Sequence, residues 1–175
     1  FKNLKISHKN NTHIIFNSID KLKNFPNKKK LIVFCGKLNK SKGYTVFGES
    51  IVKILNLYPD WKAIVVGNEP REKYNFKHSK LKIIDWLPNK DVLKIYEKAA
   101  ISVVNPLWEE PFGRTAMESA SRGCAVITSY SGGLQETFKN NLILKINNEK
   151  HLTALIKKLI NSPTNLNKIQ RENFR

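Results

Sequence analysis

Several residue types and patterns are scarce in this chain of 175 residues, and each absence removes a class of protein. Cysteine occurs only at Cys35 and Cys124, so a disulfide-rich secreted scaffold is excluded. No apolar run approaches the ~18–20 residues that a membrane-spanning helix needs, and no segment resembles a signal peptide. Both cysteines fall in apolar, strand-like segments. We interpret them as buried reduced thiols, which suits a cytoplasmic protein.

The usual signatures of metal and phosphate sites are also absent. The four histidines are scattered, without metal-ligand spacing or an acidic partner nearby. There is no D-x-D pair, no Walker A motif and no G-x-G-x-x-G. We therefore predict no metal site, and we expect any bound phosphate to be held by cations and backbone amides.

Acidic residues are few, which leaves a large positive charge. Lys and Arg number 31 against 14 Asp and Glu, for a net charge of +17. Residues 1–42 carry eleven lysines and one acid, whereas residues 105–140 carry three basic and four acidic residues. A compositional bias toward Lys and Asn is one interpretation, and a functional basic face is the other. For such a face an anionic membrane leaflet is the favoured target, because no basic motif interleaved with aromatics suggests nucleic acid.

Apolar runs and helical stripes alternate along the chain. The continuous apolar run 31–35 is typical of a parallel strand covered on both faces. We predict strands at 31–35, 61–66, 81–84, 101–105, 123–128 and 142–146, and helices at 42–58, 91–99, 113–122 and 152–160. This alternation indicates an α/β fold with a doubly wound parallel sheet. The expected division is a linker at 1–29, a Rossmann-like domain at 30–163 and a polar tail at 164–175, either helical or irregular.

Two glutamates eight positions apart, Glu110 and Glu118, say most about function. The first lies in a loop and the second in the helix that follows. The first amides of that helix, near Gly113, Arg114 and Thr115, have no intrahelical acceptor and form a ready phosphate site. Glu118 lies roughly 7–8 Å further along, about the reach from a diphosphate to a ribose, whose two hydroxyls a carboxylate can bind. Glu110 falls on the other side, where it can accept hydrogen bonds from a sugar. For the pair alone, two solvated acids are the alternative.

This stretch resembles the E-x7-E signature of retaining glycosyltransferases of family 4 (glycosyl transferases group 1), which have the GT-B fold. Three further segments match the family in the expected order: 14–20, 36–43 and 131–136. Two departures stand out. Ser18 replaces the usual Gly, and Lys37 replaces the usual Arg, which keeps the charge but loses the planar fork that grips a diphosphate.

The resemblance implies a C-terminal donor-binding domain, and the start of the chain without Met favours that interpretation. Its implied catalytic residues are Glu110, Lys37 and Lys42. Its implied donor contacts are Gly36, Gly67, Trp86, Leu87, Phe112, Gly113, Arg114, Thr115 and Glu118. Without the resemblance, ordinary surface lysines, a core or rim aromatic at Trp86 and a structural turn at 131–133 are the alternatives.

The expected function is transfer of a hexose from a UDP-, GDP- or ADP-sugar to a glycan or lipid-linked acceptor, with no cofactor and with retention. A separate N-terminal acceptor-binding domain is the implied partner, in glycan, lipopolysaccharide or cell-envelope biosynthesis at the inner face of the membrane. A GT-B nucleotide-sugar epimerase is the nearest alternative. A non-catalytic basic domain that binds nucleic acid or membrane is the alternative from another class.

Overall fold

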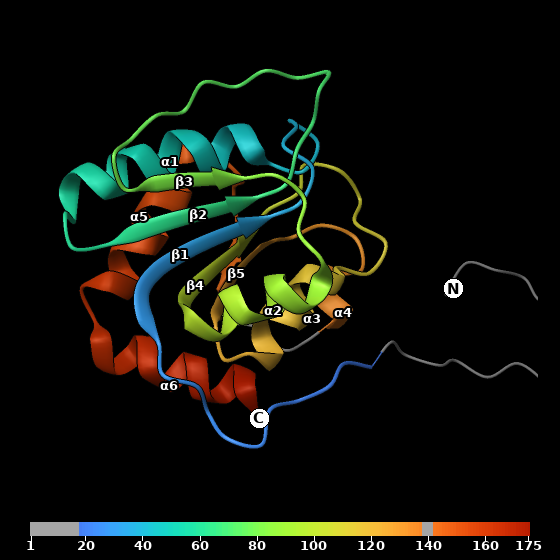
Figure 1. Cartoon of the computed structure of the whole chain (residues 1–175), viewed down its shortest axis with the longest axis vertical. Coiled ribbons are helices and arrows are strands. Elements are labelled where there is room, and N and C mark those ends of the chain that lie inside the picture. The colour runs from blue at the N-terminus through green and yellow to red at the C-terminus, as the bar shows by residue number, and fades with distance from the viewer. Residues whose placement is uncertain (1–17, 138–141) are drawn as a thin grey trace, which may run out of the picture.

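A six-stranded sheet runs through the part of the chain that the computed structural model describes, residues 18–137 and 142–175 (Figure 1). All neighbouring strands are parallel, in the order β3-β2-β1-β4-β5-β6. The strands are β1 (Lys29–Cys35), β2 (Lys62–Val66), β3 (Leu81–Ile84), β4 (Ala99–Val104), β5 (Ala125–Ser129) and β6 (Ile143–Leu144). The predicted doubly wound parallel sheet is confirmed.

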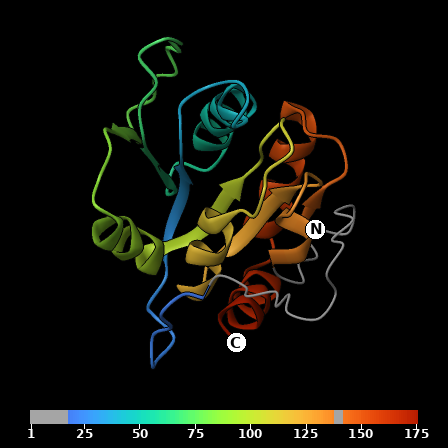
Figure 2. The same ribbon diagram turned by 90° about the vertical axis from the view of Figure 1, so that its right-hand side faces the viewer.

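Helices cover both faces of this sheet. They are α1 (Tyr44–Leu57), α2 (Asn89–Lys98), α3 (Arg114–Ser121), α4 (Leu134–Thr137), α5 (Glu149–Ile160) and α6 (Pro163–Phe174). Helices α1 and α5 pack together on one face, and α2 lies on the other (Figure 2). The long segment between β2 and β3 contains no helix and arches past α1 (Figure 1).

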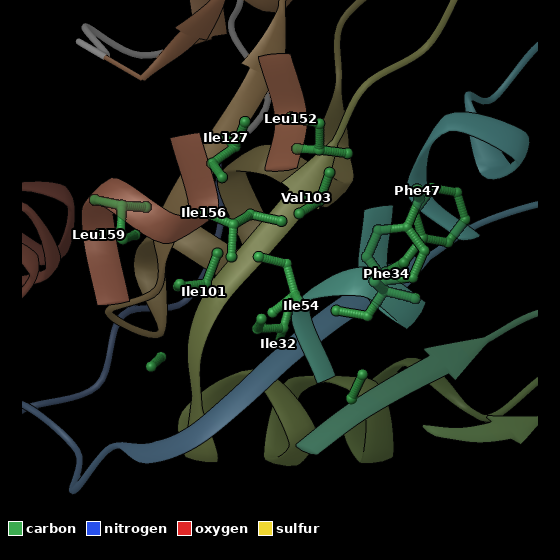
Figure 3. Packing of buried hydrophobic residues seen from close by; sticks show 14 of the residues in the cluster. Ile32, Phe34, Phe47, Ile54, Ile101, Val103, Ile127, Leu152, Ile156 and Leu159 are labelled. Atoms are coloured by element: carbon green, nitrogen blue, oxygen red, sulfur yellow. The ribbon is translucent and has the colours of Figure 1, made fainter. Parts of the chain in front are cut away.

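Two apolar layers form the core, one on each face. In β1 the side chains of Ile32 and Phe34 point toward α1 and α5, whereas Val33 points toward α2. This alternation explains why the strand is apolar at every position from Leu31 to Cys35. Figure 3 shows Ile32 and Phe34 in the same core cluster as Leu152, Ile156 and Leu159, the stripe that α5 contributes at helical spacing.

Several boundaries differ from the prediction. Helix α1 begins at Tyr44 rather than 42, because Gly43 holds a left-handed φ of 79° immediately before it. Strand β4 begins at Ala99, a residue predicted to end the preceding helix. Strand β6 has only two of the five residues predicted, and the four-residue helix α4 was not predicted.

The C-terminal residues that were expected to form a polar tail belong to α6. Leu166 is 8% exposed, and the Gln170 side-chain amide donates to the Ala100 carbonyl at 2.9 Å. The Phe174 ring meets Phe25, from the described part of the lead-in segment, with ring centroids 5.4 Å apart. Segments from both ends of the described chain therefore pack against the domain. None of the helices formed by residues 18–137 and 142–175 has the length and apolar character needed to cross a bilayer.

The order of the strands fixes where a ligand can bind. The chain runs outward from β1 to β2 and β3, then returns to β4 and continues to β5 and β6. The loops that leave β1 and β4 therefore diverge at the C-terminal edge of the sheet. Doubly wound sheets bind ligands at such a switch point.

Candidate functional site

A small cavity of about 100 Å³ lies at this switch point. Four of the predicted site residues line it: Gly36, Lys42, Glu110 and Thr115. The loops after β1 and β4 are joined there by a hydrogen bond from the Leu107 amide to the Ser41 carbonyl, at 2.8 Å. The structure thus brings together residues that are 68 positions apart in the sequence, such as Lys42 and Glu110.

Gly43 and Asn105 form the closest junction between these two loops. A Cβ at Gly43 would lie 2.0 Å from the Asn105 carbonyl oxygen, so only glycine fits. The buried Asn105 side chain donates to the Gly43 carbonyl at 3.2 Å and to Asn147 Oδ1 at 3.1 Å. Neither asparagine was among the predicted site residues. The feature of the sequence that could have identified Asn105 is a polar residue at the end of a buried strand.

The Lys42 ammonium and the Glu110 carboxylate form an ion pair, with Nζ and Oε2 2.6 Å apart. Trp108 contacts both groups. Its indole N–H donates to the same carboxylate oxygen at 3.1 Å, and its ring lies 4.5 Å from Lys42 Nζ. The Lys42 and Glu110 side chains are 28% and 17% exposed, so both remain accessible to a ligand. Trp108 is a third member of this cluster that sequence reasoning missed.

The Glu110 loop is supported from behind by the turn at Gly132 and Gly133. The Gly133 amide donates to the Glu110 carbonyl at 2.7 Å, and the Ser131 hydroxyl donates to the Trp108 carbonyl. A Cβ on Gly132 would lie 2.3 Å from the Glu110 carbonyl oxygen. This close packing gives the two glycines a structural role, the alternative considered for this turn.

Helix α3 begins immediately after the Glu110 loop. Gly113 precedes it with a left-handed φ of 85°, and no side chain caps the helix or places an acid in its first turn. The amides of Arg114 and Thr115, the first two residues of α3, therefore have no intrahelical acceptor and carry the positive end of the helix dipole. The edge of the cavity is suited to an anion.

Glu118 lies one turn further along α3 and is 6% exposed. Its Oε1 accepts a hydrogen bond from the Asn89 side-chain amide at 3.1 Å and lies 3.5 Å from an Arg114 guanidinium nitrogen. Asn89 is the first residue of α2, which packs against α3. This partner was not predicted, because nothing in the local sequence links it to Glu118. Arg114 was expected to contribute only its amide, but its side chain pairs with Glu118 while remaining 73% exposed.

Four other predicted site residues, Lys37, Gly67, Trp86 and Leu87, follow the ends of β1, β2 and β3. Lys37 is exposed and makes no ion pair with another described residue. Gly67 follows β2, and a Cβ there would lie 1.9 Å from the Gly36 carbonyl oxygen. The close approach of these two backbone segments therefore requires glycine at position 67. Trp86 follows β3 and is 55% exposed, whereas Leu87 packs into the core layer beneath α2.

Both cysteines are free thiols. Burial raises the pKa of Cys35, at the end of β1, to about 11, and burial likewise raises the pKa of Cys124 to about 11. Such thiols stay protonated near neutral pH and are poor nucleophiles. Within residues 18–137 and 142–175, no three His, Cys, Asp or Glu side chains gather closely enough to hold a metal ion.

Comparison with known families gives a match over residues 16–175 to the family described as glycosyl transferases group 1. Among curated proteins, spore coat protein SA of Bacillus subtilis is 27% identical over 151 residues. That match covers 77% of this chain and 40% of the relative. The chain therefore spans less than half of that relative's length.

Two solved structures show the same fold. The C-terminal domain of a glycosyl transferase group 1 family protein (LpcC) from Francisella tularensis superimposes with a TM-score of 0.75 and 22% identity. This match covers 88% of our chain and 91% of that domain. Anabaena Alr3699/HepE, crystallised with UDP, gives a TM-score of 0.72 at 16% identity and covers 83% of our chain and 43% of its own.

Proposed function

Because the chain belongs to the glycosyl transferases group 1 family, we propose that it is the donor-binding domain of a retaining glycosyltransferase that uses a nucleotide-sugar. The observation that carries this proposal is the arrangement of three features along the loop after β4 and helix α3. Glu110 comes first, paired with Lys42 from the loop after β1; the open N-terminus of α3 follows, and Glu118 lies one turn beyond it. These features match the sugar, the diphosphate and the ribose of the donor in the same order.

Each group has a defined task in this proposal. Glu110 accepts hydrogen bonds from sugar hydroxyls. Lys42 lies between that carboxylate and the phosphate, and the α3 amides face the phosphate oxygens. Breaking the glycosyl–phosphate bond adds negative charge to the departing nucleotide, and fixed cations and amide dipoles stabilise that charge. Lys37, exposed on the same rim, is assigned to the diphosphate as well.

At the other end of the donor, Glu118 accepts hydrogen bonds from the ribose hydroxyls. Gly67, Trp86 and Leu87 border the space assigned to the base. We take a uridine donor as the first candidate, with GDP- and ADP-sugars as alternatives, because HepE was crystallised with UDP and with UDP-glucose. We assign the acceptor site to a further domain, since the chain covers only 40% of spore coat protein SA and 43% of HepE.

The test is titration calorimetry of the domain with UDP-glucose, GDP-mannose and ADP-glucose, followed by the Glu118→Ala variant. Loss of two charge-assisted hydrogen bonds should cost about 1.5–3 kcal/mol, which is roughly 10- to 150-fold in Kd. Glu109→Ala is the matched control, because Glu109 is an exposed carboxylate in the adjacent loop. Equal affinity in the Glu118 variant and the control would remove the ribose role.

Two further outcomes separate the alternatives. An epimerase converts its donor sugar when no acceptor is present, whereas a transferase requires an acceptor. A non-catalytic basic domain would bind duplex DNA or anionic vesicles with a steep salt dependence and would show no response to nucleotide-sugars.

A further inference from the structure

A second concave site lies at the opposite end of the sheet. It is a cleft of about 570 Å³ at the N-terminal ends of the first three strands. Eleven residues line it, and six of them are lysines from separate segments: Lys29 and Lys30 of β1, Lys62 of β2, Lys80 and Lys82 at the start of β3, and Lys98 at the end of α2. We call this feature the lysine cleft.

Compositional bias does not account for the lysine cleft. Lysine makes up 26 of the 175 residues, so eleven residues drawn without preference would include one or two. The cavity at the switch point has a single lysine among ten lining residues, and so does the groove beneath the segment between β2 and β3. The excess therefore belongs to this cleft and does not extend to these two concave surfaces.

Protection of a strand edge accounts for only part of the cluster. Lysines on edge strands prevent unwanted pairing, and β3 is an edge strand. Lys29 and Lys62, however, lie on β1 and β2 in the interior of the sheet, and Lys98 lies on a helix. These three gain nothing from edge protection.

Most of the charge in the cleft is uncompensated. Lys30 forms an ion pair with Asp60, and the Lys80 ammonium donates to the Pro59 carbonyl. No acidic residue lines the cleft. In the described chain, no ion pair or hydrogen bond engages the other four ammonium groups, those of Lys29, Lys62, Lys82 and Lys98. Like charges held together at this density repel one another, and a multivalent anion would relieve that repulsion.

The floor of the cleft is apolar, with Leu31 and Ala63 buried and Ile64 and Leu81 half-buried. A site with an apolar floor and a cationic rim matches an anion that has a hydrocarbon part. Lysine ammonium groups are compact charges on flexible stems that bind phosphate oxygens.

We propose that the lysine cleft binds a multiply charged phosphate group, separately from the donor site. The chemistry is shared by a phosphorylated lipid headgroup and a soluble polyphosphate. Binding to the first would hold this face of the domain against a membrane. This proposal does not depend on the identity of the donor.

The test compares two variants of equal net charge. The cleft variant changes Lys29, Lys62, Lys82 and Lys98 to Gln. The control changes four exposed lysines outside the cleft to Gln: Lys77, Lys145, Lys150 and Lys158. Each protein is sedimented with phosphatidylcholine vesicles that contain phosphatidic acid, and separately titrated with inorganic triphosphate.

We expect the cleft variant to lose at least about tenfold in affinity for one of these ligands and the control to lose less than about twofold. Loss in the vesicle arm identifies a lipid headgroup, and loss in the triphosphate arm alone identifies a soluble phosphate. Equal losses in both variants, or no binding of either ligand by the unmodified protein, would overturn the proposal.

A second measurement needs no variant. The unmodified protein is acetylated with and without ligand, and the extent of labelling at each lysine is read by mass spectrometry. Bound ligand should protect the cleft lysines from acetylation, whereas Lys77 and Lys158 should be labelled to the same extent in both samples. Protection confined to Lys37 and Lys42 would place the anion at the donor site instead and would also refute the proposed role of the lysine cleft.

Discussion

Trp108→Phe is the most informative single substitution at the switch point, because it removes one hydrogen-bond donor and keeps an aromatic ring. In the structure the Trp108 indole N–H lies 3.1 Å from Glu110 Oε2, and the ring lies 4.5 Å from the Lys42 ammonium. Phenylalanine retains the ring beneath the ammonium but removes the indole N–H, so that among the described residues Lys42 alone still holds the carboxylate. The change therefore tests whether the indole positions Glu110 for the sugar.

The size of the effect follows from these contacts. A hydrogen bond to a charged group contributes about 1.5–3 kcal/mol, and a cation–π contact at an accessible site about 0.5–1 kcal/mol. Glu110 is 17% exposed and Lys42 28% exposed, so solvent weakens the first contribution, and the second is largely kept. We expect a loss of about 1–2 kcal/mol in binding of the nucleotide-sugar, which is roughly 5- to 30-fold in Kd.

Calorimetry with two ligands makes this prediction specific. The affinity for the nucleotide-sugar should fall, whereas the affinity for the nucleoside diphosphate should stay the same, because only the sugar contacts Glu110 in our proposal. Glu109→Gln, in the same loop, should change neither value. Equal weakening for both ligands would mean that the substitution disturbs the loop as a whole, and unchanged binding of both would refute a positioning role for Trp108.

Three further predictions concern the stability of the domain. Lys28→Met removes a half-buried ammonium that donates to three main-chain carbonyls at 2.7–3.2 Å. Unfolding by denaturant should therefore show a loss of about 2–3 kcal/mol, against less than about 0.5 kcal/mol for Lys29→Met. Gly67→Ala places a Cβ 1.9 Å from a carbonyl oxygen of the adjacent loop at a φ of +144°, and should cost about 2–4 kcal/mol in the same assay. The hydrogen-bonded guanidinium of Arg71 lowers the pKa of Glu69 from 4.5 to about 2. The contribution of this ion pair to the stability of the folded domain is therefore complete above pH 4.5 and is lost as the pH falls toward 2. Thermal unfolding of Glu69→Gln between pH 6 and pH 2 should show a shallower acid-side decline than the unmodified protein, and an identical decline would contradict this assignment.

The sequence by itself determined the class of the fold and the position of the helix at the site. Apolar runs such as 31–35 and stripes such as Leu152, Ile156 and Leu159 depend on local periodicity, which reports which faces are buried. The interval from Glu110 to Glu118 is also local, because a loop and one helix of known rise connect the two carboxylates. The family resemblance rested on the same local segments.

Boundaries were predicted less well, because several depend on contacts between distant segments. The polar residues 164–174 lie in helix α6, where Leu166 is buried and the Gln170 side chain donates to the Ala100 carbonyl. Strand β6 is short because only Ile143 and Leu144 pair with β5. Neither outcome follows from the composition of the segment alone.

Only the tertiary structure decided which side chains meet. Lys42 and Glu110 are 68 residues apart, and their pairing requires β1 and β4 to be neighbours at the switch point. The partnership of Asn89 with Glu118 depends in the same way on the packing of α2 against α3. The lysine cleft arises because three strands begin at one edge of a parallel sheet. Hydrophobic periodicity shows which face of an element is buried but contains no information on which element covers it, and that information resides in the strand order.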